Sequence, residues 1–227
     1  MRLILASQSP RRQRLVQLLG YPVTVQVADV DESSVTDPDP AVNVVKTAVL
    51  KATTIHHRLQ ERSAPSLIVA ADTIVALDRQ MLGKPVDAAD AWQMLAALRN
   101  RPHEVHTGLV VLDVQSGQMV SRVNTAVVTM RDYTNEEIAA YVASGDPLDK
   151  AGAYAIQHPV FQPVANMAGC YTAVMGLSVC ELITVLDSLD LPRRADLTAV
   201  YHAHEVADRH YPCPIYDQIL VKSSESC

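Results

Sequence analysis

The run SLIVAADTIVALD, residues 66–78, constrains the fold of this chain more than any other stretch. It is strongly apolar and rich in β-branched residues, a composition that predicts a buried β-strand. Asp72 and Thr73 interrupt the apolar run. A carboxylate in such a place is costly unless it has a partner or lies at an exposed bend, and acids held there are more often functional than structural. Asp72 is therefore the first candidate for a functional residue.

The elements around this strand predict an α/β protein. Strands and helices alternate in the first half of the chain, and a hairpin of two long strands with a turn at Ser116-Gly117 follows. Ser9 is the expected N-cap of the first helix, and Thr134 with Glu137 forms an expected capping box. We expect strands at residues 3–6, 23–28, 66–78 and in the two halves of 103–130, and helices at 10–20, 40–59, 87–100, 134–144 and 176–189. This order predicts a mixed sheet with flanking helices.

Composition places the chain among globular proteins, because 48% of the 227 residues are hydrophobic and 19% are charged. We find no apolar run of the roughly 18–20 residues that a membrane span needs, and the apolar start is too short for a signal peptide. We therefore expect a cytoplasmic protein without a membrane partner. The net charge of −6 argues against stable binding of nucleic acid. The cysteines lack CxxC spacing, so buried or incidental thiols are expected instead of disulfides: Cys170, Cys180, Cys213 and Cys227.

The segment SQSPRR, residues 7–12, lies at a predicted corner between a strand and a helix. Backbone N–H groups at a helix start, together with arginines, form a natural phosphate site. Geometry alone somewhat favours the other interpretation, an ordinary strand-to-helix turn. The choice between a phosphate site and an ordinary turn therefore depends on the other polar residues of the chain.

Basic and acidic groups recur at separate points of the chain, as a site for a polyanion and a metal requires. Arginine and lysine side chains can hold phosphates, while Glu32 and Asp72 offer hard oxygen ligands for a divalent cation. The full set of candidates is Ser7, Ser9, Arg11, Arg12, Glu32, Lys51, Asp72, Lys84, Asp149 and Lys150. The chain has no Walker motif, no GxGxxG after a strand and no GxSxG, so P-loop, Rossmann and α/β-hydrolase chemistry lack support.

The histidines do not form a recognisable metal motif. His103 and His106 are three apart in a predicted strand and should lie on opposite faces, which argues against a shared metal. The C-terminal stretch holds zinc-type ligands in a spacing that matches no standard site: His202, His204, His210 and Cys213. We interpret this stretch as a loosely ordered tail, and we expect the core to fold without the residues after Leu191.

Several motifs over residues 2–190 together resemble the Maf family of nucleoside triphosphate pyrophosphatases: LILASQSPRRQRLVQLLG, DVDE, ADTIVALD, LGKP, HTG and GDPLDKAGAYAIQ. The resemblance implies a Maf/ITPase-like, two-lobed fold around an elongated mixed β-sheet with a central cleft. It implies hydrolysis of a nucleoside triphosphate to the monophosphate and pyrophosphate, with a divalent cation (Mg²⁺ or Mn²⁺), by a homodimer. Residues 1–191 would form the catalytic domain, and residues 192–227 an extension of unknown role.

The resemblance also assigns roles to individual residues. Asp72 would accept a proton from the attacking water and, with Glu32, hold the metal. The phosphates would be bound by Ser7, Ser9, Arg11, Arg12, Lys51 and Lys84. Arg11, Thr73 and Gln157 match the residues of relatives that act on dTTP and UTP, whereas relatives that act on 7-methyl-GTP tend to have Trp, Gln and Glu there.

Two alternatives remain at this point. One is 7-methyl-GTP hydrolysis, and the other is a non-catalytic, nucleotide-binding regulator of cell division. The chain departs from the family after Gln157, where HPVFQPVANMAG replaces glycine-rich sequence, and near AGCYTAVMGLSV, which replaces a stretch that commonly ends Gly-Leu-Pro.

Overall fold

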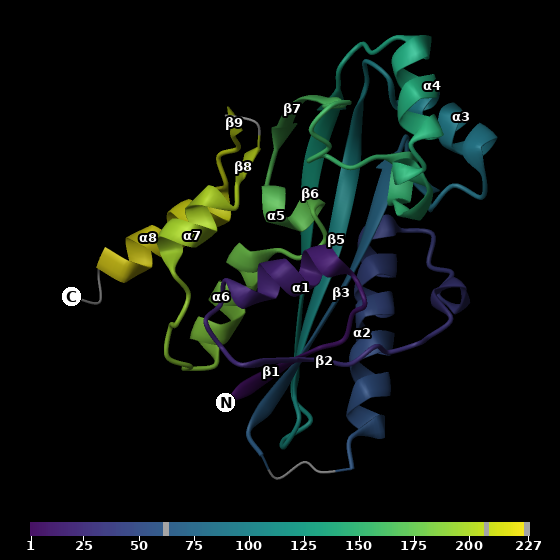
Figure 1. Ribbon diagram of the computed structural model, residues 1–227. Coiled ribbons are helices and arrows are strands. Elements are labelled where there is room, and N and C mark those ends of the chain that lie inside the picture. The colour runs from purple at the N-terminus through teal and green to yellow at the C-terminus, as the bar shows by residue number, and fades with distance from the viewer. Residues whose placement is uncertain (61–63, 207–208, 225–227) are drawn as a thin grey trace.

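A seven-stranded mixed sheet forms the spine of the molecule (Figure 1). The computed structural model describes residues 1–60, 64–206 and 209–224. The strands are β1 (Arg2–Leu5), β2 (Val23–Val25), β3 (Ser66–Leu77), β4 (Gln80–Leu82), β5 (Pro102–Asp113), β6 (Met119–Met130) and β7 (Val164–Ala168). Their order is β2-β1-β3-β5-β6-β7, with β4 paired to β3. Strand β1 runs parallel to β2 and β3, and the later pairs are antiparallel, which confirms the predicted mixed sheet.

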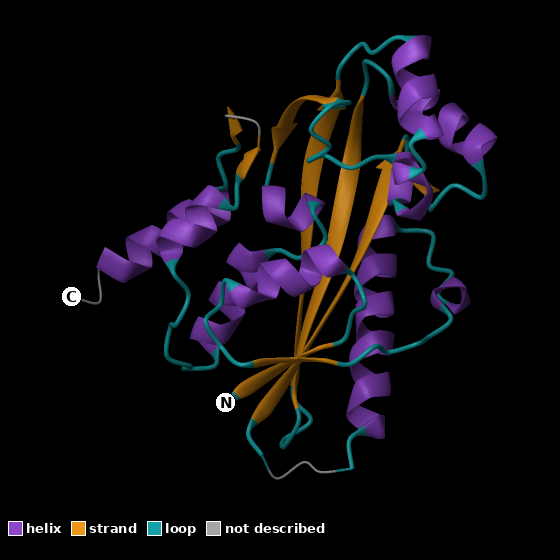
Figure 2. Cartoon of the chain, in the orientation of Figure 1, coloured by secondary structure: helices purple, strands orange, loops and turns teal. Residues whose placement is uncertain are grey.

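Helices cover both faces of the sheet, as Figure 2 shows. The longer ones are α1 (Pro10–Gln17), α2 (Pro40–Arg58), α3 (Ala88–Leu98), α4 (Asn135–Ala143), α6 (Val179–Ser188) and α8 (Pro214–Ser224). The short ones are α5 (Tyr171–Val174), α7 (Leu197–His202) and the 3₁₀ turns η1 (Glu32–Ser34), η2 (Asp146–Asp149) and η3 (Ala151–Ala153). None of the helices in the described part of the chain is long and apolar enough to cross a membrane.

The helix starts follow from local sequence. The Ser9 side chain caps α1 by accepting from the Arg12 N–H, and Pro10 occupies the first turn, where no N–H is needed. Both hydrogen bonds of the predicted capping box between Thr134 and Glu137 are present at α4. The second strand is shorter than predicted and ends at Val25, and the loop that follows carries a left-handed residue at Asp29 (φ 44°).

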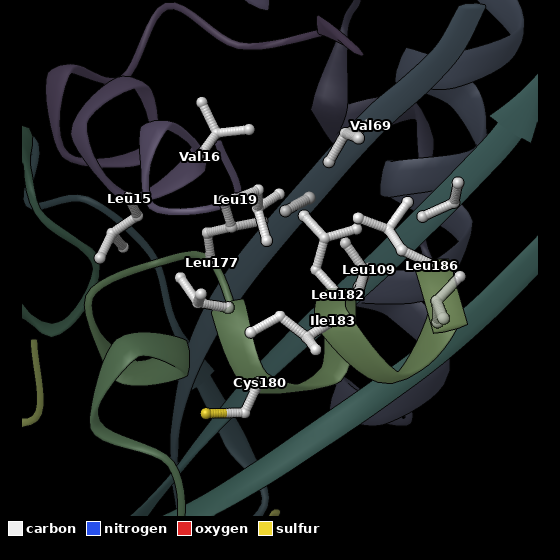
Figure 3. Packing of buried hydrophobic residues seen from close by; sticks show 14 of the residues in the cluster. Leu15, Val16, Leu19, Val69, Leu109, Leu177, Cys180, Leu182, Ile183 and Leu186 are labelled. Atoms are coloured by element: carbon white, nitrogen blue, oxygen red, sulfur yellow. The ribbon is translucent and has the colours of Figure 1, made fainter. Parts of the chain in front are cut away.

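The first lobe has apolar layers on both faces of the sheet, because alternate residues of β1 and β3 point to opposite sides. Leu3 and Leu5 belong to a cluster with α1 and α6, whereas Ile4 and Ile68 pack under α2. All of these side chains are at most 1% exposed. Figure 3 shows the first cluster, in which α1 and the turn after it contribute Leu15, Val16 and Leu19, and α6 contributes Leu182, Ile183 and Leu186.

The second lobe surrounds the other ends of the long strands. Helices α3 and α4 pack against one another there, and their buried residues join side chains of β5 and β6 and of the segment 153–167 in a separate cluster. The long strands β3 and β5 contribute residues to the clusters of both lobes. The two-lobed fold predicted from the resemblance is therefore present.

Gly108 in β5 permits the close approach of α2 to the sheet. A Cβ at this position would lie 2.5 Å from the Val44 carbonyl oxygen, which is backbone and has no room to move aside. Only glycine therefore allows α2 to pack at this depth. The glycine of the HTG motif thus sets the position of α2, and with it the position of Lys51 over β3.

The expectation of a loosely ordered C-terminal tail is wrong for the described part of that segment. It forms α7, α8 and a small hairpin of β8 (Glu205–Val206) and β9 (Arg209–His210). Val200 and Ile219 are fully buried in the same cluster as α1 and α6. Because this packing covers apolar surface of the first lobe, removal of the segment would expose that surface, contrary to the expectation that the core folds without it.

Candidate active site

A pocket of about 680 Å³ opens between the two lobes. Its wall includes the start of α1, the loop before η1, the middle of β3 and the segment 149–157. Every residue to which the sequence assigned a site role lines it: Ser7, Ser9, Arg11, Arg12, Glu32, Lys51, Asp72, Thr73, Lys84 and Gln157. The volume lies within the range typical of small-molecule sites. The fold therefore brings together polar residues that are up to 150 positions apart in the chain, from Ser7 to Gln157.

A lysine joins the two carboxylates at the floor of the pocket. The Lys51 Nζ lies 2.8 Å from Asp72 Oδ1 and 2.8 Å from Glu32 Oε1. Lys51 and Asp72 are almost buried, at 6% and 8% exposure, whereas Glu32 is open to solvent. A buried ammonium and a buried carboxylate each require a partner of opposite charge, and Lys51 and Asp72 are partners of one another. This explains how the apolar strand β3 tolerates an acid at its centre.

The same two carboxylates form a donor set suited to a hard divalent cation. Within the part of the chain that the structure describes, neither Asp72 Oδ2 nor Glu32 Oε2 takes part in a hydrogen bond or ion pair. These second oxygens belong to residues that line the pocket. Carboxylate oxygens with room for further water and phosphate ligands match what Mg²⁺ and Mn²⁺ prefer, so the residues present fit such an ion.

Arg12 is held as a fixed cation at the start of α1. Its Nε donates to the Gly176 carbonyl at 2.7 Å, and its Nη2 donates to Thr73 Oγ1 at 3.3 Å. Burial lowers the pKa of the Arg12 guanidinium, an effect that the charges of Asp72 and Glu32 oppose. The guanidinium remains protonated because the unperturbed pKa of arginine is so high. Arg12 therefore presents a positive charge that is already oriented before a ligand binds.

Thr107 was missed as a supporting residue by the sequence analysis. Its hydroxyl donates to the Ala173 carbonyl at 2.8 Å and lies 3.0 Å from the Thr73 hydroxyl, so it connects β3 to α5 behind Arg12. The HTG motif contained Thr107, but residue spacing along one strand does not reveal which neighbour on another strand it contacts. The sequence analysis therefore identified the HTG motif but assigned no role to Thr107.

The remaining phosphate candidates differ in their exposure to solvent. Ser7 is buried, and its hydroxyl accepts the Ser9 N–H at 3.2 Å, which shapes the loop before α1. Arg11 and Gln157 are half-buried, and Lys84 is exposed in the loop after β4. The pocket therefore combines a fixed cation at Arg12 with a half-buried one at Arg11 and an exposed one at Lys84.

Asp149 and Lys150, which the sequence offered without a role, form a local ion cluster at the pocket wall. The buried Lys150 Nζ lies 2.7 Å from Asp149 Oδ1 and 3.0 Å from Asp146 Oδ1, and it donates to the Asp146 carbonyl. Three acceptors around one ammonium fix the turn between η2 and η3. That turn leads directly into the segment that carries Tyr154 and Gln157.

Tyr154 is a wall residue that the sequence analysis also missed. Its hydroxyl lies 2.8 Å from His103 Nε2, and no partner for His103 Nδ1 is found among the described residues. His106 lies elsewhere, with its Nδ1 3.0 Å from Thr125 Oγ1. The two histidine rings thus have different hydrogen-bond partners. Burial lowers the pKa of His103 to about 4, so its ring is neutral near pH 7.

The zinc-type ligands of the C-terminal segment do not line this pocket. His202 instead lies 2.9 Å from Glu205 at the surface, and the His210 ring stacks on Tyr201. His204 and Cys213 are buried together with Cys170 and Cys180.

Comparisons with known proteins find relatives over most of the chain. A family model described as Maf-like protein matches residues 2–189. The chain is 39% identical over 191 residues to a dTTP/UTP pyrophosphatase of Syntrophotalea carbinolica, which covers 84% of this chain and 86% of that protein. It is 40% identical to proteins of the same name from Chlorobium phaeovibrioides, covering 82% and 96%, and from Desulforamulus reducens, covering 81% and 94%. The family match includes every pocket residue.

The neutral His103 predicts a specific dependence of stability on pH. In the unfolded chain a histidine takes up a proton near pH 6.5, whereas the folded protein resists protonation down to about pH 4. Unfolding therefore binds a proton within this window, and the free energy of unfolding should fall as the pH drops through it, by up to about 3 kcal/mol. Denaturant titrations from pH 7.5 to 4.5 measure the fall.

The matched variant is His103→Gln, which keeps a polar partner for Tyr154 and cannot titrate. Its free energy of unfolding should decline less steeply than that of the wild type between pH 6.5 and pH 4.5. Parallel curves for the two proteins would show that His103 does not contribute to the pH dependence.

Proposed function

Because this chain belongs to the Maf family, we propose that it hydrolyses nucleoside triphosphates, dTTP and UTP foremost, to the nucleoside monophosphate and pyrophosphate. The observation that carries the proposal is the convergence of Asp72, Glu32 and Lys51 in a pocket that also holds Arg12. A carboxylate pair for a cation and a set of fixed positive groups are what hydrolysis of a phosphoric anhydride requires. We assign this activity to residues 1–191. The resemblance also supports a cytoplasmic homodimer.

The start of α1 is the proposed phosphate site. Arg12 lines the pocket and is already oriented by Gly176 and Thr73, so little freedom is lost when a phosphate binds to it. The helix N-terminus adds a partial positive charge on the same side. Ser7, Ser9, Arg11 and Lys84 add donors around it. These groups stabilise the charge that develops on the leaving pyrophosphate.

Asp72 is the proposed proton acceptor. Its Oδ1 is held by Lys51, and its Oδ2 is available to a water molecule in the pocket. That water attacks the α-phosphorus, its proton passes to the carboxylate, and the bond between the α-phosphorus and the bridging oxygen breaks to release pyrophosphate. A divalent cation held by Glu32 and Asp72 would supply neutralisation of the phosphate charge.

Gln157 supports the choice of a pyrimidine nucleotide. Its side chain is half-buried in the pocket wall on the segment opposite α1. An amide both donates and accepts hydrogen bonds, which suits the alternating groups on a uracil or thymine edge, whereas a carboxylate would only accept.

The proposed activity predicts pyrophosphate release that depends on Asp72. Wild-type protein should hydrolyse dTTP and UTP with higher kcat/KM than GTP or 7-methyl-GTP, measured as pyrophosphate released from each nucleotide. Asp72→Asn should lower kcat by on the order of 10²–10⁴, because an amide keeps the shape of the side chain and cannot take up a proton.

Asp78→Asn is the matched control, since Asp78 is an exposed acid just past the end of β3, ion-paired with Arg101. It should retain wild-type activity. Circular dichroism must show that both variants are folded. A folded Asp72→Asn protein with the wild-type rate would remove Asp72 from the mechanism, and absence of turnover in the wild type on all four nucleotides would contradict the proposal as a whole.

The carboxylate pair predicts dependence on a hard cation. Activity should disappear after chelation and return with Mg²⁺ or Mn²⁺. Glu32→Gln should then raise the concentration of Mg²⁺ needed for half-maximal activity by about 10-fold or more, because it replaces a charged ligand with a neutral one. An unchanged Mg²⁺ dependence in Glu32→Gln would exclude this residue as a ligand.

Base selectivity should change in Gln157→Glu. The amide donor becomes an acceptor, so a base carbonyl loses its partner and faces a like-signed oxygen. An unmet buried polar group costs about 1–3 kcal/mol, which corresponds to roughly 5- to 150-fold in kcat/KM. The loss should be larger for dTTP and UTP than for GTP. Gln162→Glu, on the same loop and exposed, is the control. Equal losses for all nucleotides would mean that Gln157 does not contact the base.

A further inference from the structure

Four metal-type ligands gather in the first lobe, apart from the residues that line the pocket. They are Cys170, Cys180, His204 and Cys213, and their ligand atoms all lie within 4.8 Å of one another. Each residue is at most 3% exposed. Cys170 precedes α5 and Cys180 lies in α6, whereas His204 follows α7 and Cys213 precedes α8. Figure 3 shows Cys180 at the edge of the aliphatic cluster, with its sulfur turned away from the labelled leucines.

The distances within this group match the edges of a tetrahedral metal site. A zinc ion with bonds of about 2.3 Å to sulfur and about 2.0 Å to nitrogen sets its ligands about 3.8 Å apart for two sulfurs and about 3.5 Å apart for sulfur and nitrogen. The observed distances are 3.8 Å between Cys180 Sγ and Cys213 Sγ. They are 3.6 Å from His204 Nε2 to both Cys170 Sγ and Cys180 Sγ.

The surroundings orient the ligands. His204 Nδ1 lies 2.8 Å from the Val200 carbonyl, which can only accept, so Nδ1 carries the proton and Nε2 presents its lone pair to the sulfurs. This is the usual arrangement of a histidine that binds a metal. The hydroxyls of Thr172 and Ser178 lie 3.1 Å and 3.6 Å from Cys170 Sγ and can donate to a thiolate.

Disulfide formation does not account for the group. The three cysteines are free, and the sulfurs of Cys180 and Cys213 are 3.8 Å apart, well beyond the bond length of about 2.05 Å. Simple apolar burial does not account for it either, because it would not bring one imidazole nitrogen and three sulfurs from four separate points of the chain to the same place.

We propose that Cys170, Cys180, His204 and Cys213 bind one structural Zn²⁺ ion. Three soft sulfur ligands and one imidazole, all buried, form a closed tetrahedral site of the type that selects zinc. It differs in chemistry from the hard-oxygen pair of Asp72 and Glu32. The proposal does not depend on the activity of the pocket.

Such an ion would fasten the C-terminal segment to the rest of the chain. Residues 192–227 contribute His204 and Cys213, and the part that the family model covers contributes Cys170 and Cys180. Cys170 also begins the α5 segment, whose Gly176 carbonyl holds Arg12. The extension, whose role the sequence left unknown, is therefore assigned a structural role in supporting one wall of the pocket.

Metal analysis of the full-length protein tests the site without reference to activity. Protein purified without added metal or chelator should contain about one zinc atom per chain. After replacement of zinc by Co²⁺, the visible spectrum should show the intense bands of tetrahedral cobalt bound to thiolates. Removal of the zinc should lower the melting temperature by on the order of 10 °C, because an ion that binds only the folded state stabilises it.

His204→Asn and Cys213→Ser should lose the zinc and the cobalt bands, whereas His202→Asn, two residues from His204 and exposed, should keep both. The wild-type measurements keep the test valid if a ligand variant fails to fold. Wild-type protein without zinc that also gives no thiolate–cobalt spectrum would overturn the proposal, as would full zinc content in a folded His204→Asn variant.

Discussion

The contact of Lys51 with both Asp72 and Glu32 is the interaction on which the rest of the site depends. It places a positive charge between two negative ones at a nearly buried point of the sheet. Removing one member of a buried ion pair typically costs about 3–5 kcal/mol, because the remaining charge stays desolvated without a partner. An acid can therefore sit in the middle of β3 only because α2 supplies a lysine above it. The depth of α2 in turn depends on Gly108, which leaves the space that any side chain would fill.

Two of the charged side chains that line the pocket are held in place by neighbouring polar groups. Gly176 and Thr73 orient Arg12, and Asp146 with Asp149 holds Lys150. Groups oriented in advance stabilise developing charge without first having to rearrange. The two lobes have separate apolar clusters, so each wall of the pocket is backed by its own packed core.

The C-terminal segment shows how a weak sequence pattern can hide an ordered structure. Helix α7 has only six residues, so it does not display enough turns for a clear period of 3.6 residues. The burial of the segment is nevertheless complete at Val200 and Ile219, since the surface that receives them is provided by the first lobe. Tertiary packing stabilises these helices, and the stability of a helix as short as α7 cannot come from its own sequence.

The sequence by itself determined the long strands, most boundaries of the longer helices and the types of residue available for chemistry, but not the short strands β4 and β7. Caps such as Ser9 and the Thr134–Glu137 box act within four residues, and the continuous apolar run of β3 indicates a strand buried on both faces, so local sequence suffices for them. The resemblance to the Maf family indicated which of these residues belong to one site. Only the tertiary structure decided that Lys51 bridges two acids, that Tyr154 meets His103, and that Cys170 and Cys180 meet His204 and Cys213. Such contacts join positions far apart in the chain, and their distances depend on the path of the whole backbone, which no local period encodes.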